Sequence, residues 1–96
     1  MPLVFEWDSR KAKSNQRKHG VSFDEGCTVF DDSRATIFPD EDHSNGEERE
    51  IIVGYSILDR MLLVSFTERS LDRVRVISAR KATRREQRDY EENIGS

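Results

Sequence analysis

The sequence predicts a small α+β domain in which helices pack on an antiparallel β-meander sheet, in the order β-α-α-β-β-β-β-α. Three observations support this fold class. The length of 96 residues suits one domain spanning 1–96. Apolar residues fall into strand-length blocks, which lie at 51–58, 61–67 and 74–79. Two capping boxes, Ser22-Phe-Asp-Glu25 and Thr83-Arg-Arg-Glu86, mark the starts of helices.

The first predicted elements are a short strand and a polar helix. The apolar residues within 4–7 are typical of a strand. Asp8 or Ser9 can cap a helix that runs through Lys18, and Gly20 suits the left-handed position that closes it. This helix is almost wholly polar.

The second helix should run from the first capping box over residues 23–30, with Cys27 as a small buried residue. A short strand at 35–38 follows and ends at Pro39, which cannot donate a backbone hydrogen bond. Residues 39–48 are acidic and rich in turn formers, so we expect an exposed loop there.

Three strands in a meander and a last helix complete the prediction. The gap at 59–60 has hairpin length, although it lacks the glycine that favours a two-residue turn. A short connection at 70–73 leads into the third strand of the meander. The last helix should reach about Asn93 and has only Tyr90 and Ile94 as apolar residues, so we expect it to pack loosely or against a partner.

The charge of the chain is unevenly distributed. Charged residues make up 36% and hydrophobic residues 34%, which predicts a thin core. The net charge of −3 argues against a nucleic-acid-binding protein. However, residues 1–21 carry +3, residues 22–50 carry −8 and residues 69–88 carry +6. At physiological salt, solvent ions screen charges that lie farther away than about one Debye length. The two basic segments can therefore still attract phosphates, although the whole chain is acidic.

Compartment and cofactor signals are sparse. The sequence shows neither a signal-peptide pattern nor an apolar stretch of membrane-span length, so we expect a cytoplasmic protein. The loop beginning at Asp40 fails as a calcium site because glycine and glutamate are missing from the required positions. His43 lacks a second histidine at ligand spacing. We therefore expect no metal and no cofactor.

Six short motifs stand in order along the chain. They are Phe5-Glu-Trp-Asp8, Lys11 with Asn15, Lys18-His-Gly-Val-Ser-Phe23, Glu47-Glu-Arg49, Phe66-Thr-Glu-Arg69 and Ile77-Ser-Ala-Arg-Lys-Ala-Thr-Arg-Arg-Glu86. Together they resemble the BrnT family of bacterial ribonuclease toxins, partners of the BrnA antitoxins in type II toxin–antitoxin pairs. The resemblance covers residues 3 to about 92. It implies a RelE-like fold, RNA cleavage without a metal, inhibition by a cognate BrnA-like antitoxin and operator-DNA binding through the antitoxin complex.

The candidate catalytic residues are Arg69, Arg80, His19 and Glu68. Metal-independent RNA cleavage must deprotonate a 2′-hydroxyl, stabilise charge on the phosphorane and protonate the leaving oxygen. Arginine suits the middle task because it stays charged and presents a planar fork of donors. His19, at a helix C-terminus, or Glu68 could transfer protons. Alternatively, His19 is a helix-end cap and Glu68 belongs to an ion pair at the rim of the core.

Further basic and aromatic residues are candidates for RNA binding. Arg69 and Arg80 each end a strand, and we expect both to converge on one sheet edge. Lys81 and Arg84 should join them there. The other candidates are Lys11 and Lys18 on one helical face and Tyr90 as a stacking residue, whereas Trp7 is expected in the core. The alternative interpretation of the basic residues is a solvated surface.

Two functions follow from these observations. The leading hypothesis is an endoribonuclease toxin that arrests translation and is neutralised by its antitoxin. The alternative is a non-catalytic, partner-dependent component of an autoregulatory transcriptional repressor, which the thin core and the sparse last helix would suit.

Overall fold

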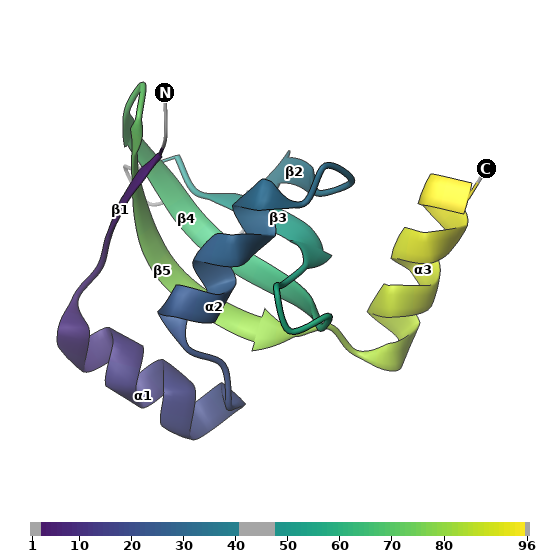
Figure 1. Ribbon diagram of the computed structural model, residues 1–96, viewed down its shortest axis with the longest axis horizontal. Helices are drawn as coiled ribbons and strands as arrows, with labels where there is room; N and C mark the ends of the chain where they lie inside the picture. The colour runs from purple at the N-terminus through teal and green to yellow at the C-terminus, as the bar shows by residue number, and fades with distance from the viewer. Residues whose placement is uncertain (1–2, 41–47, 96) are drawn as a thin grey trace.

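The computed structural model describes residues 3–40 and 48–95. Its strands form one five-stranded sheet in the order β1-β5-β4-β3-β2. The strands are β1 Val4–Glu6, β2 Thr36–Pro39, β3 Glu50–Tyr55, β4 Met61–Ser70 and β5 Arg73–Lys81. The helices are α1 Ser9–His19, α2 Phe23–Thr28, the 3-10 turn η1 Val29–Asp31 and α3 Arg84–Gly95. Helices α1 and α2 cover one face of the sheet (Figure 1), which confirms the predicted α+β class and element order.

The sheet differs from the prediction at its first strand. Strands β3, β4 and β5 form the expected antiparallel meander, whereas β1 pairs with β5 in parallel. Two helices and three strands separate β1 from β5 along the chain. No hairpin therefore joins the two strands, and nothing local imposes an antiparallel pairing. The sheet is therefore mixed and not wholly antiparallel.

Helix α1 begins and ends at strong sequence signals. The Asp8 carboxylate, and not Ser9, caps it by accepting from the backbone N–H groups of Arg10 at 2.8 Å and Lys11 at 3.3 Å. Gly20 closes it with φ 69°, a left-handed conformation that glycine adopts without steric cost. The helix ends at His19, one residue later than predicted.

The second helix is shorter than predicted. Ser22 caps α2 by accepting from the backbone of Glu25 at 3.0 Å, but the helix ends at Thr28 and continues as η1. The predicted single helix over 23–30 is therefore two segments. The tighter turn places Val29 in the core.

The hydrophobic core lies between these helices and the sheet. Its fully or almost fully buried side chains are Val21, Phe23, Val29, Ile52, Leu62, Val64, Phe66, Val74, Val76 and Ala79. Trp7 packs against this core edge-on to Phe23, with ring centroids 5.8 Å apart, as predicted.

The β3–β4 connection is longer than the predicted two-residue gap. Strand β3 ends at Tyr55, so residues 56–60 form the loop. Ser56 and Arg60 close this loop by a backbone hydrogen bond of 2.9 Å, and Asp59 takes φ 61°. Because the sequence offers no glycine for a tight turn, the chain uses a wider loop with aspartate in the left-handed position.

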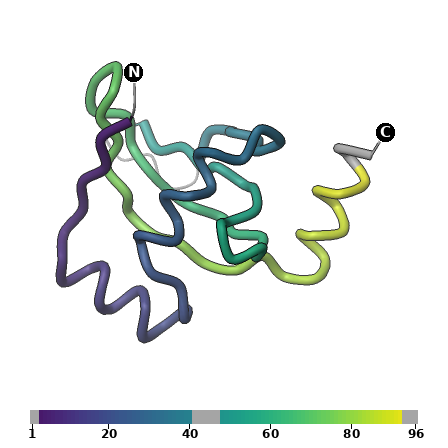
Figure 2. Tube along the Cα trace, viewed as in Figure 1, coloured from purple at the N-terminus to yellow at the C-terminus, as the bar shows by residue number. Residues whose placement is uncertain are grey.

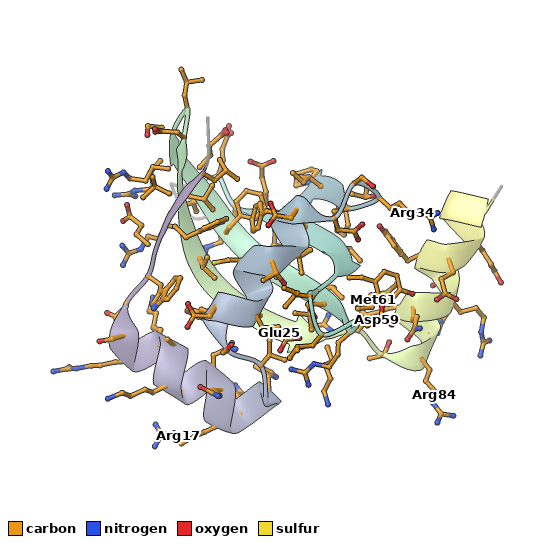
Figure 3. The ribbon with its side chains drawn as sticks, viewed as in Figure 1. Arg17, Glu25, Arg34, Asp59, Met61 and Arg84 are labelled. Atoms are coloured by element: carbon orange, nitrogen blue, oxygen red, sulfur yellow. The ribbon has the colours of Figure 1, made fainter. Side chains whose placement is uncertain are left out.

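Helix α3 stands at the end of β5, apart from α1 and α2 (Figure 2). It contacts the rest of the chain mainly through polar side chains. The Tyr55 hydroxyl donates to the Glu91 carboxylate at 2.7 Å, and the Tyr90 hydroxyl donates to the backbone carbonyl of Arg34. Arg34 lies on the side of its loop that faces α3 (Figure 3).

Candidate functional site

Arg80 occupies the junction between β5 and α3. Its side chain is 41% exposed, and its guanidinium donates to both carboxylate oxygens of Glu86, with distances of 2.8 Å to Oε1 and 2.9 Å to Oε2. The hydrogen bonds with Arg80 lower the pKa of Glu86 to about 2, and the same pairing raises the pKa of Arg80. Both groups therefore stay charged across the physiological pH range.

Further positive charge surrounds this junction. Lys81 ends β5 and Arg84 begins α3, and both side chains are exposed. Figure 3 shows Arg84 pointing from the start of α3 away from the sheet. Arg80, Lys81 and Arg84 thus belong to one turn of the chain, although Arg80 and Lys81, as consecutive strand residues, point to opposite faces of the sheet.

Arg69 does not join this group, so the predicted convergence of Arg69 and Arg80 is wrong. Arg80 pairs with Leu63 near the start of β4, whereas Arg69 lies near the end of β4, where Ser70 pairs with Arg73. Arg69 lies six positions along β4 from Leu63, which is about 20 Å at roughly 3.3 Å per residue. Consecutive antiparallel strands run in opposite directions, so their C-terminal residues lie at opposite ends of the sheet, and the prediction overlooked that rule.

A second cluster surrounds Arg69 instead. A cavity of about 300 Å³ is lined by Glu48, Glu50, Thr67, Glu68 and Arg69. Glu68 is exposed here. The Thr67 hydroxyl is buried and has no hydrogen-bond partner in the described part of the chain. Arg69 is thus set among carboxylates, a more acidic environment than that of Arg80.

Helix α1 carries the other predicted residues. Lys11 and Lys18 are exposed, and His19 is half-buried at the last position of the helix. The side chain of Asn15 fixes this helix beside β5, since it donates to the Ala79 carbonyl at 2.8 Å and accepts from the Ala79 N–H at 3.1 Å. The C-terminal end of α1 thereby lies at the same end of the sheet as Lys81.

Tyr90 has a structural contact in addition to any role in stacking. It is half-buried, its hydroxyl bonds the carbonyl of Arg34, and burial raises its pKa. The hydrogen bond to Glu91 likewise raises the pKa of Tyr55. These two tyrosines hold α3 against the body of the protein.

Sequence reasoning missed a buried charged network beside α2. Glu25 is 7% exposed and accepts from Arg60 Nε at 2.9 Å and from the Ser56 hydroxyl at 2.7 Å. The hydrogen bonds from Arg60, followed by that from Ser56, lower the pKa of Glu25 despite its burial. Arg60 also donates to the carbonyl of Gly20 at 3.3 Å. Figure 3 shows Glu25 directed toward the loop that carries Asp59, so this network ties the β3–β4 loop to both helices.

Glu86 was missed as a site residue, although its signal is present in the sequence. It is the last residue of the second capping box, and Arg80 stands at the end of the preceding strand. Only two residues separate β5 from α3, so a carboxylate in the first turn of the helix lies close to the end of the strand. Glu48 and Glu50 carry no such signal, because the strand pairing that brings them to Arg69 is not local in sequence.

Several expectations concern residues of which little is described. His43 lies outside the described residues. Within residues 3–40 and 48–95, no group of three or more His, Cys, Asp or Glu side chains is arranged to hold a metal ion. Within those same ranges, no helix has the length and apolar character needed to cross a membrane.

Comparisons with known proteins point to one family. The sequence profile of a family described as "Ribonuclease toxin, BrnT, of type II toxin-antitoxin system" matches residues 7–86. Among solved structures, the crystal structure of the Brucella abortus ribonuclease toxin BrnT resembles the chain with a TM-score of 0.64 and 24% identity. That likeness, which is one of fold, covers 88% of this chain and 99% of the Brucella chain. No protein of curated function matches.

Proposed function

Since the chain belongs to the BrnT family of type II toxin–antitoxin ribonuclease toxins, we propose that it cleaves RNA at the β5–α3 junction, with Arg80 binding the scissile phosphate. The observation that carries this proposal is the half-exposed side chain of Arg80, held by Glu86 at the end of β5, with Lys81 and Arg84 at the same turn of the chain. Fixed positive charge at that point lowers the energy of the phosphorane, whose charge exceeds that of the ground state.

Distance excludes one of the two candidates for proton transfer. Glu68 lies five residues along β4 from Leu63, the pairing partner of Arg80, which is about 17 Å at roughly 3.3 Å per residue. A general base must come within hydrogen-bond reach of its proton, so Glu68 does not act on a phosphate held by Arg80. His19 lies one turn beyond Asn15, at the end of the sheet that carries Arg80, and we assign the acid–base role to it.

The remaining basic residues fit RNA binding. Lys11 and Lys18 share one exposed face of α1, where they can hold backbone phosphates. Glu68 and Arg69 line a cavity about 20 Å along the sheet, at roughly 3.3 Å per residue, so we assign to them contacts with nucleotides distant from the cleavage point. The half-buried ring of Tyr90 leaves part of its surface for a base at the α3 side.

The proposal includes the cellular role. Cleavage needs no metal, because arginine supplies the charge stabilisation and a side chain supplies the proton transfer. Loss of RNA arrests translation in the cytoplasm. A BrnA-like antitoxin neutralises the enzyme, and operator DNA is bound only through that complex.

RNA cleavage by the purified, antitoxin-free protein in the presence of EDTA tests the proposal. We expect cleavage by the wild-type protein and its loss in Arg80→Ala and Arg80→Lys, since lysine cannot present a fork. Arg17→Ala is the matched control, because Arg17 is an exposed arginine that points into solvent from α1 (Figure 3). Full cleavage by folded Arg80→Ala would show that Arg80 does not bind the scissile phosphate. Intact RNA with every variant, together with an operator shift that needs the antitoxin, would favour the non-catalytic repressor component.

A further inference from the structure

The contact between Arg80 and Glu86 uses one defined side of the guanidinium group. Arg80 Nη1 donates to Glu86 Oε1, and Nη2 donates to Glu86 Oε2, so the carboxylate meets the end of the planar group. Nη1 also donates to the backbone carbonyl of Lys81 at 3.3 Å. These contacts restrain the guanidinium from two directions and thereby fix its plane.

Glu86 is itself held in place. Its Oε1 accepts from the backbone N–H of Thr83 at 2.9 Å, and its own backbone N–H donates to the Thr83 hydroxyl at 3.1 Å. This reciprocal capping box sets the first turn of α3 at a fixed orientation to the end of β5. The carboxylate also lies near the positive end of the helix dipole, where negative charge is favoured. Because the capping box holds Glu86 in place, Glu86 in turn restrains the position of Arg80.

The remaining donors of Arg80 form a second fork. A guanidinium carries five N–H donors, and the bonds to Glu86 and Lys81 use three of them. The other two, on Nε and on Nη2, lie side by side on the adjacent edge of the plane. That spacing matches two oxygens of a phosphate.

We propose that Glu86 is a positioning residue, which holds Arg80 so that its Nε and Nη2 fork faces the scissile phosphodiester of the RNA. The inference rests on the proposed function, and it names the atoms that take the phosphate. In the absence of Glu86, the arginine would sample several rotamers, and only a fraction of them would present both donors together. Orientation of this kind is worth on the order of a hundred-fold in rate when a reacting group is displaced by about 1 Å.

The test measures kcat and KM for cleavage of one RNA oligonucleotide by Glu86→Gln, Arg80→Ala and the double variant. Glutamine also serves at this position of a capping box, so Glu86→Gln should fold while losing the charge and one acceptor of the pair. We expect kcat to fall on the order of ten- to a hundred-fold, with KM changed by less than about three-fold. In the Arg80→Ala background, Glu86→Gln should have no further effect, because it acts through Arg80.

Glu92→Gln is the matched control. It makes the same chemical change at an exposed position of α3, six residues beyond Glu86, so kcat should stay near the wild-type value. A comparable loss of kcat in Glu92→Gln would mean that the charge of the helix alone matters, and it would overturn the inference.

The remaining outcomes separate the inference from the proposed function. If Arg80→Ala is inactive while Glu86→Gln keeps or exceeds the wild-type kcat, Glu86 does not position Arg80, and the centre at Arg80 still stands. If Glu86→Gln lowers kcat equally with and without Arg80, Glu86 acts by another route and the inference is wrong. If Arg80→Ala remains fully active, the proposed function fails at its first step, and the inference fails with it.

Discussion

The side-chain amide of Asn15 takes the place of a neighbouring strand beside Ala79. Strand β1 pairs with β5 only as far as Arg75, and farther along, Asn15 donates to the Ala79 carbonyl and accepts from the Ala79 N–H. The same Asn15 amide nitrogen donates to the carbonyl of Val21 at 3.0 Å. One buried side chain therefore satisfies the sheet edge and closes the connection between α1 and α2.

Asn15→Ala should destabilise the fold strongly. It leaves the N–H and C=O of Ala79 buried without partners, and each unsatisfied group costs about 1–3 kcal/mol, so we expect a loss of about 2–4 kcal/mol. Urea unfolding followed by circular dichroism measures the change. Gln16→Ala, at the exposed neighbouring position, should change stability by less than about 0.5 kcal/mol. Equal stability of the two variants would contradict the role given to Asn15.

Gly54→Ala should also destabilise the fold, for a steric reason. A Cβ at this position would come within 2.8 Å of Asp32 Oδ2 and 2.9 Å of Ala35 Cβ. The first of these atoms also accepts from the Tyr55 N–H at 2.8 Å, so it cannot withdraw without breaking that bond. We expect a loss of about 1–3 kcal/mol in the free energy of unfolding.

Gly26→Ala is the comparison for this prediction. Its added Cβ would meet Ala79 Cβ at 3.3 Å, a milder approach, and alanine favours the helix by about 1 kcal/mol over glycine. We therefore expect a nearly neutral change in thermal midpoint. A Gly26→Ala variant that is less stable than Gly54→Ala would contradict the packing described at Gly54.

The stability difference between wild type and Glu86→Gln should depend on pH. The pKa of Glu86 is lowered from 4.5 to about 2 in the folded protein by Arg80. The carboxylate therefore stabilises the fold above pH 4.5, and this contribution is lost as the pH falls from 4.5 toward 2. With 35% of its side chain exposed, solvent screening limits the effect to about 1 kcal/mol. Urea unfolding of both proteins at neutral and acid pH should show the difference shrinking toward acid; a constant difference would speak against it.

Cys27 should resist alkylation in the folded protein. Cys27 is partly buried and not fully buried as predicted. This partial burial, with a smaller contribution from Asp24, raises the pKa of its thiol to about 12, so little thiolate is present at pH 8. We expect iodoacetamide to react at least about ten-fold more slowly with native protein than with protein unfolded in urea. Because the chain has one cysteine, the mass increase reports this site alone. Equal rates in the two states would contradict the burial.

The two faces of α1 should differ in RNA binding. Lys11→Ala and Lys18→Ala should each weaken binding across RNA sequences and reduce the salt dependence by about one counterion. Lys13 is also exposed, but it lies on the other side of the helix, so Lys13→Ala is the matched control and should leave the salt dependence unchanged. Fluorescence anisotropy over a range of salt concentrations measures all three. An equal effect of Lys13→Ala would mean that the helix contributes only general charge.

The local parts of the fold could be predicted from the sequence. Asp8, Gly20 and both capping boxes mark helix ends that depend on neighbouring residues, and all lie where expected. The second half of the first box differs, because Glu25 pairs with Arg60 through the β3–β4 loop. A contact between residues 35 positions apart leaves no trace in a four-residue motif.

The site was harder to predict because it depends on strand direction. The positive charge of residues 69–88 suggested that Arg69 and Arg80 belong to one site. However, the distribution of charge along a sequence does not show which residues of neighbouring strands pair. Only the pairing of Leu63 with Arg80 shows that Arg80 lies beside the start of β4, whereas Arg69 lies near its end. Lys81 and Arg84 follow Arg80 closely in the sequence, so their position at the same turn of the chain does not depend on strand pairing.

The position of β5 has a consequence for the order in which the protein matures on the ribosome. This strand lies between β1 and β4, although it is synthesised after both of them. Until it emerges, β1 lacks its partner and Asn15 lacks the backbone of Ala79. The segment that completes the sheet is also the one that carries Arg80. Under the proposed function, a nascent chain therefore lacks its cleavage centre until β5 has been translated.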